Sequence, residues 1–120
     1  MARLLMFNIR DEAKRNQLKI LSLRLSFSCQ DVPPEKQGLT LRGILIGQAP
    51  ADAPSAPFQD EMLVLNGFVN EDLDFLLQEM RRTHTTVALK AVVTETNQYW
   101  TPLQLRNTLI AERLSMKGKA

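Results

Sequence analysis

A short polar segment near the C-terminal end holds the side chains best suited to bind a ligand. They are Thr94, Thr96, Asn97, Trp100 and Thr101. Threonine and asparagine donate and accept hydrogen bonds, and Trp100, the only tryptophan, offers a flat face for stacking. The segment joins an apolar stretch to a marked helix start, and ligands collect at such junctions in parallel α/β sheets. The sequence therefore predicts a candidate ligand site here.

The same residues also fit a structural role, which is the preferred interpretation. Trp100 can pack back onto the following helix as a hydrophobic staple, and Asn97 can stabilise a turn by bonding to nearby backbone. The adjacent Tyr99 and Trp100 form an aromatic pair that is typical of a contact surface when it is exposed. Both roles stay open from the sequence alone.

Three further residues could do chemistry, and each has a simpler explanation. Lys90 lies in an apolar stretch where desolvation can activate an amine, but lysine is also a common guard on an edge strand. Cys29 has no histidine nearby in the sequence, which favours a buried, inert thiol, and His84 follows a predicted helix whose dipole explains it. With one cysteine and one histidine, we expect no internal disulfide, no metal site and no cofactor.

Signatures of common enzymes are missing. No glycine-rich phosphate loop and no nucleophile elbow occur, and the neighbouring carboxylates Glu71 and Asp72 fit the first turn of a helix. A conventional kinase or hydrolase is therefore not expected.

Size and composition indicate one globular domain over residues 1–120, with 44% hydrophobic and 23% charged residues. A net charge of +2 is too small to favour nucleic-acid binding. The apolar runs are too short to span a bilayer, and the N-terminal run is too short for a signal peptide. We therefore expect a cytoplasmic protein that does not enter the membrane.

Hydrophobic periodicity predicts four strands and four helices. The predicted strands cover 4–8, 27–32, 61–67 and 86–93. The predicted helices start at a cap on Asp11, near Leu39, at a cap on Asn70 and at the Thr101-Pro102 pair. Leu39 to Gly47 could also be a strand, and the helix is preferred because of the repeat described next.

The two halves of the chain share an order of elements and short sequence matches. Leu4 to Asn8 aligns with Met62 to Asn66, and the leucine pattern from Leu39 aligns with the pattern from Leu103. These matches predict an internal duplication, with repeats 1–47 and 61–115 joined by an Ala/Pro-rich linker, 48–60. The predicted fold is α/β, in which two strand-helix-strand-helix repeats form one four-stranded mixed or parallel sheet covered by helices.

Several segments resemble a small bacterial family known only as a domain of unknown function. The segments are Leu4 to Asn8, Asp31 to Gly38, Val64 to Phe68 and, most specifically, Lys90 to Asn97 with Trp100-Thr101. The resemblance covers most of the chain. It implies a domain of this kind and no particular activity.

The preferred function is a non-enzymatic cytoplasmic interaction or regulatory domain that binds a protein partner or a second copy of itself. The missing catalytic motifs and the Tyr99-Trp100 pair favour it. The alternative is a small-molecule-binding domain or weak enzyme with its site near Thr94 to Thr101.

Overall fold

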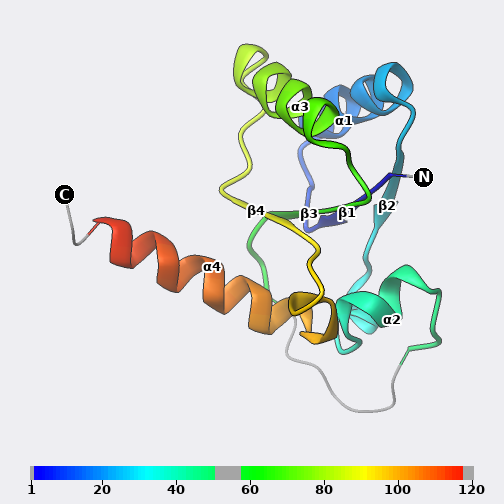
Figure 1. Cartoon of the computed structure of the whole chain (residues 1–120), viewed down its shortest axis with the longest axis vertical. Helices are drawn as coiled ribbons and strands as arrows, with labels where there is room; N and C mark the ends of the chain where they lie inside the picture. The colour runs from blue at the N-terminus through cyan, green and yellow to red at the C-terminus, as the bar shows by residue number, and fades with distance from the viewer. Residues whose placement is uncertain (1, 51–57, 118–120) are drawn as a thin grey trace.

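The protein contains one four-stranded mixed sheet with helices on both faces, as seen in the computed structural model, which describes residues 2–50 and 58–117 (Figure 1). The strand order is β2-β1-β3-β4. The strands are β1 (Arg3–Phe7), β2 (Ser28–Asp31), β3 (Met62–Asn66) and β4 (Leu89–Val92). The α/β class and the four-stranded sheet predicted from the sequence are confirmed.

The two central strands run antiparallel, and each outer strand runs parallel to its inner neighbour. Leu5 pairs with Val64 at the centre, Arg3 with Ser28 on one side, and Met62 with Leu89 on the other. Each half contributes one parallel pair, and β2 and β4 are the edges of the sheet. The order of elements is the same in both halves, and the sequence duplication itself stays a prediction.

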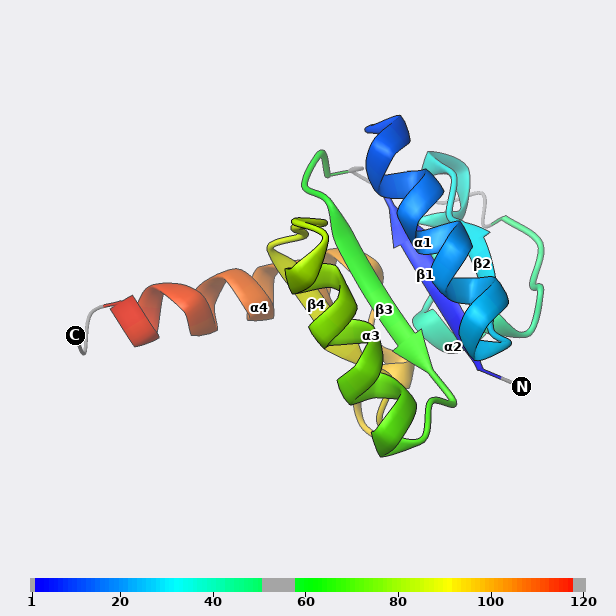
Figure 2. The same cartoon turned by 90° about the horizontal axis from the view of Figure 1, so that it is seen from above.

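Helices cover the two faces in pairs (Figure 2). The helices α1 (Glu12–Leu25) and α3 (Asn70–Arg82) lie on one face, and α2 (Leu41–Leu45) and α4 (Pro102–Lys117) lie on the other. Both central strands are buried on both faces, which explains their unbroken apolar sequences. Alternate residues feed two clusters: Leu4 and Leu63 face α1 and α3, whereas Leu5 and Val64 face α2 and α4.

Two of the three predicted helix caps are confirmed. The Asp11 carboxylate accepts from the N–H groups of Ala13 and Lys14. Thr101 and Gln104 form a reciprocal capping box, with N–H to side-chain oxygen distances of 2.8 and 3.2 Å.

The prediction that Asn70 caps α3 is wrong. The helix begins one residue earlier than the pattern suggests, because the Leu73 N–H already donates to the Val69 carbonyl and places Val69 at the cap. No side chain caps this end, and Glu71 and Asp72 in the first turn supply the negative charge that it favours.

The last strand is shorter than predicted. After α3, His84 adopts a left-handed backbone with φ of 56°, and the Thr85 N–H donates to the Met80 carbonyl, which closes the helix with a Schellman turn. The chain then reaches β4 only at Leu89. Sequence periodicity extended this strand back to Thr86 because the connection is also apolar.

The predicted linker covers residues 48–60. Residues 51–57 of it lie outside the described residues. Its last three residues pack on the body of the protein. Phe58 is 7% exposed and stacks on Phe7 at 5.9 Å between ring centroids. The Asn8 side chain donates to the carbonyls of Phe58 and Asp60.

A buried carboxylate joins the two helices on one face of the sheet. Glu79 of α3 accepts from Arg82 at 2.6 Å and from Arg24 of α1 at 2.9 Å. The hydrogen bond from Arg82, followed by the charges of Arg82 and Arg24, holds the pKa of Glu79 below its usual value. Because folding lowers this pKa, the ion pairs contribute stability above the ordinary carboxyl pKa and lose it as pH falls through the lowered value.

Glu79→Gln is therefore expected to flatten the acid side of the stability profile. Urea unfolding at about pH 6 and about pH 3 measures the difference. The native chain should lose more stability between these two pH values than Glu79→Gln, and the exposed Glu112→Gln should behave like the native chain. Equal losses in native chain and Glu79→Gln would contradict this assignment.

Candidate functional site

The loop predicted to bind a ligand is closed by its own hydrogen bonds. It contains a short 3-10 helix, η2 (Asn97–Tyr99), between β4 and α4. The Asn97 Oδ1 accepts from the Thr94 N–H at 2.7 Å, and the Asn97 N–H donates to the Thr94 Oγ1 at 3.0 Å. The Asn97 Nδ2 donates to the Val92 carbonyl at 3.0 Å. The structure thus brings Thr94 and Asn97 together, with their polar atoms bonded to this loop.

The other predicted site residues lie apart from that pair. Trp100 is partly buried against the cluster under α2 and α4, and its carbonyl accepts from the Leu41 N–H at 2.9 Å. Thr101 caps α4, and Thr96 is exposed. Tyr99 is 61% exposed, so the two aromatics point into different surroundings. A ligand-binding role for these residues stays a prediction.

Cys29 on β2 is half-buried. Burial raises the pKa of its thiol, so the reactive thiolate is disfavoured at neutral pH. This agrees with the prediction of an inert thiol.

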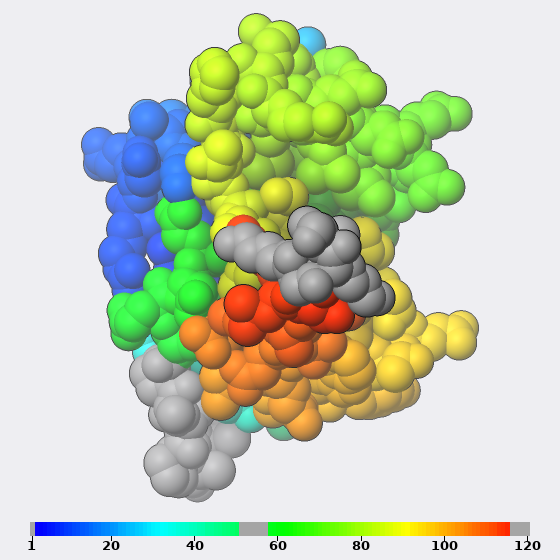
Figure 3. All heavy atoms as spheres, turned by 90° about the vertical axis from the view of Figure 1, so that its left-hand side faces the viewer, coloured from blue at the N-terminus to red at the C-terminus, as the bar shows by residue number. Residues whose placement is uncertain are grey.

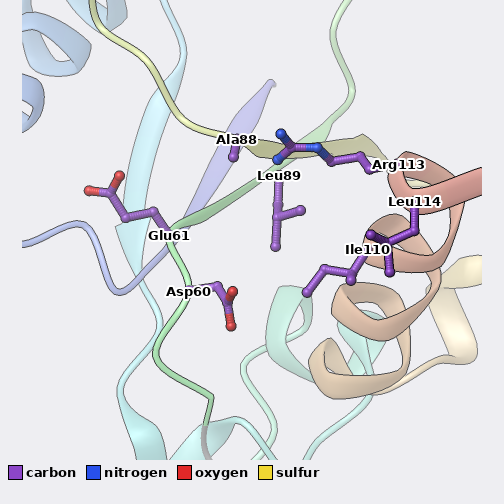
Figure 4. Close-up of a pocket in the computed structure, with 7 residues that line it drawn as sticks. All are labelled: Asp60, Glu61, Ala88, Leu89, Ile110, Arg113 and Leu114. Atoms are coloured by element: carbon purple, nitrogen blue, oxygen red, sulfur yellow. The ribbon is translucent and has the colours of Figure 1, made fainter. Parts of the chain in front are cut away.

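A groove lies near the N-terminal end of β4, between this edge strand and α4 (Figure 4). Its volume is about 350 Å³. The side chains of Ile110 and Leu114 from α4 face Leu89 of β4 across it, and the Arg113 guanidinium lies alongside β4. Asp60 lines the same groove at the start of β3.

The groove exists because α4 runs outward past the edge of the sheet. The helix passes behind β4 and continues beyond the sheet edge (Figure 2). Leu105, near its start, is 2% exposed, Leu109 and Ile110 are partly buried, and Leu114 is 64% exposed. The apolar stripe of α4 therefore runs past the last strand that could cover it.

A second hollow of about 530 Å³ flanks the opposite face of the same edge. It is lined by Leu77 and Arg81 of α3 and by Lys90 of β4. Both hollows include Glu61 and Ala88, and the successive residues Leu89 and Lys90 line one hollow each, which places the hollows on the two sides of β4. Figure 3 faces this edge, with α4 below and the end of α3 with the following segment above.

Positive charge is in excess around the edge. Glu61 pairs with Lys14 at 2.6 Å, and Asp60 pairs with Arg106 at 2.9 Å. In the described part of the chain, by contrast, no carboxylate forms an ion pair with the three cations nearest β4, which are Arg81, Lys90 and Arg113. Desolvation, followed by the charges of Arg113 and Arg81, lowers the pKa of Lys90.

Backbone groups of β4 also face outward. The Val93 N–H donates to the Leu65 carbonyl of β3 at 2.9 Å. Because the direction of backbone groups alternates along a strand, Ala91 also faces β3, whereas Lys90 and Val92 face away from it. Asn97 takes up the Val92 carbonyl, which leaves the Val92 N–H and both backbone groups of Lys90 at the open edge.

Sequence reasoning placed Lys90 correctly on an edge strand and missed the rest of this groove. In the sequence, Arg81 suits the C-terminal end of a helix dipole, and Ile110 and Leu114 continue the apolar stripe of the last helix. One signal was present: the stripe continues to Leu114, well beyond the turns that a short strand can cover.

Residues 61–116 match the sequence model of a family described as Domain of unknown function (DUF3783). For the second half of the chain, this match agrees with the resemblance, noted from the sequence, to a domain family of unknown function. The matched stretch contains β3, α3, β4 and nearly all of α4, and so nearly all of the groove. No curated protein and no solved structure shows a significant match.

None of the helices in the described ranges, 2–50 and 58–117, is long and apolar enough to cross a membrane. Within the same ranges, no three His, Cys, Asp or Glu side chains are grouped so that they could hold a metal ion.

Proposed function

We propose that this chain is a non-enzymatic interaction domain that binds a protein partner in the β4 groove. This name denotes the surface formed by Leu89, Lys90, Ile110, Arg113 and Leu114. The observation that carries the proposal is the apolar stripe of α4, which extends past the sheet and leaves Leu114 64% exposed beside a hollow. An exposed apolar stripe rimmed by charged side chains is typical of protein-binding surfaces.

In this proposal, the loop from Thr94 to Thr101 supports the groove. Asn97 fixes the end of β4 through the Val92 carbonyl, and Thr101 starts α4 in the direction that takes it under the edge strand. A small-molecule site in the loop is the second candidate, for which the exposed Thr96 and Tyr99 are available.

A cytoplasmic location is also proposed, and the single cysteine supports it because secreted domains of this size commonly carry disulfides. Self-association stays a prediction. The like charges of Arg81, Lys90 and Arg113 disfavour β4 as the contact between two copies.

Selection from a displayed library of random linear peptides tests the proposed function. The native chain should enrich a set of related peptides, and Leu114→Asp should weaken their binding by about tenfold or more because it places a charge in the apolar part of the groove. Leu23→Asp is the matched control, since Leu23 is 79% exposed on α1. Failure to enrich any peptide, or equal binding by Leu114→Asp, would overturn the proposal.

A further inference from the structure

We infer that the partner segment is an extended acidic strand that adds to β4 as the fifth strand of the sheet. Its side chains would alternate between apolar residues over α4 and acidic residues facing Lys90 and Arg81. This inference rests on the proposed function and specifies the chemistry of the partner.

The open backbone groups of β4 favour a strand over a helix or a compact surface. By the alternation set out above, the N–H and carbonyl of Lys90 and the N–H of Val92 lie on the outer side, where no strand of the described residues pairs with β4. An extended segment satisfies such groups in the way that edge strands bind peptides. The carbonyl of Val92 is already bonded to Asn97, so the added strand would end at this point.

The two faces of the edge differ in chemistry, and this difference sets the pattern of the partner. Leu89 belongs to the cluster on the α4 side, where it lines the groove together with Ile110 and Leu114. Lys90 points to the opposite face, where it lines the second hollow together with Arg81. Because side chains alternate along a strand, a segment paired with β4 would present every second residue to each face.

Charge complementarity identifies the polar half of that pattern as acidic. The acids at this edge, Asp60 and Glu61, are already paired with Arg106 and Lys14. Arg81 and Lys90 line the same hollow, and Arg113 lies alongside β4, so a carboxylate among these cations would relieve the repulsion between like charges. A second copy of this chain would instead bring the same cations together across the contact.

Two synthetic peptides test the inference: one of alternating valine and glutamate, and one of alternating valine and lysine. Titration followed by NMR should show the acidic peptide bound at β4 and the basic peptide unbound. The double variant Lys90→Glu, Arg81→Glu should weaken the acidic peptide by about tenfold or more and bind the basic peptide instead. Lys19→Glu, exposed on α1 by the opposite edge, should bind as the native chain does.

Equal affinity for both peptides, or no effect of the charge reversal, would overturn the inference. The peptide library distinguishes a failure of this inference from a failure of the proposed function. If library peptides that depend on Leu114 prove to be neutral or helical, the groove binds a partner and the acidic strand is wrong. If no library peptide depends on Leu114, the proposed function itself is wrong. Thermal unfolding of each variant confirms that the fold is retained.

Discussion

Replacing Asn97 by alanine is expected to lower the free energy of unfolding by about 2 kcal/mol, because the Thr94 N–H and the Val92 carbonyl each lose a hydrogen bond to a buried side chain. Asn97 is 9% exposed, and its side chain bonds the Thr94 N–H and the Val92 carbonyl. Asn97→Asp keeps the acceptor for Thr94 but places a carboxylate oxygen against the Val92 carbonyl, so it should also lower the free energy of unfolding. Chemical denaturation measures both changes.

Thr96→Ala is the matched control in the same loop. Thr96 is exposed, and its replacement should change the free energy of unfolding by no more than about 0.5 kcal/mol. If Asn97→Ala behaves like Thr96→Ala, the bonds of Asn97 do not hold this junction.

Proline substitutions at two adjacent positions of β4 should have opposite consequences. Lys90→Pro removes an N–H that faces outward, so it should leave the fold intact and weaken binding of a library-selected peptide by about a hundredfold. Ala91→Pro removes an N–H that faces β3 and should lower the free energy of unfolding by about 3 kcal/mol or more. Thermal melts and a peptide titration separate the two effects.

The contrast between the two prolines depends on the direction of the backbone along β4. A Lys90→Pro chain that melts like Ala91→Pro would show that Lys90 faces β3. A folded Lys90→Pro chain with native affinity would show that the partner does not pair with this edge.

Local patterns predicted the elements because they depend on neighbouring residues. Leu4 to Phe7 and Met62 to Leu65 are continuous apolar runs, and both prove to be central strands buried on two faces. The caps at Asp11 and Thr101 were predicted from side chains that bond within three residues. Asn70 was assigned as a cap because its residue type suits one, whereas the backbone had already turned helical at that position.

The arrangement of the halves could not be predicted in the same way. The sequence left the sheet open as mixed or parallel, because the pairing of Leu5 with Val64 joins residues far apart in the chain. The groove has the same origin, since it combines the start of β3, the edge at Leu89 and the end of α4 at Leu114. Leu105 and Leu114 both lie on α4, and only the position of the sheet edge makes the first buried and the second exposed.

The same reason explains why residue types in the sequence point to the C-terminal end of β4 and not to the groove. Trp100 and Asn97 attract attention by residue type, yet they bond to the loop and to α2. Lys90 and Arg113 are ordinary surface residues in the sequence. The fold places them together, at the outer side of β4 and beside the end of α4.

Amide hydrogen exchange at single residues of β4, with and without a library-selected peptide, tests the central claim most directly. In the free chain, the Lys90 and Val92 amides should exchange fast, and the Ala91 and Val93 amides should exchange slowly. Bound peptide should slow Lys90 and Val92 by about tenfold or more and leave the other two unchanged. Unchanged exchange at Lys90 and Val92, with protection confined to Thr94 to Thr101, would contradict the β4 groove as the binding surface.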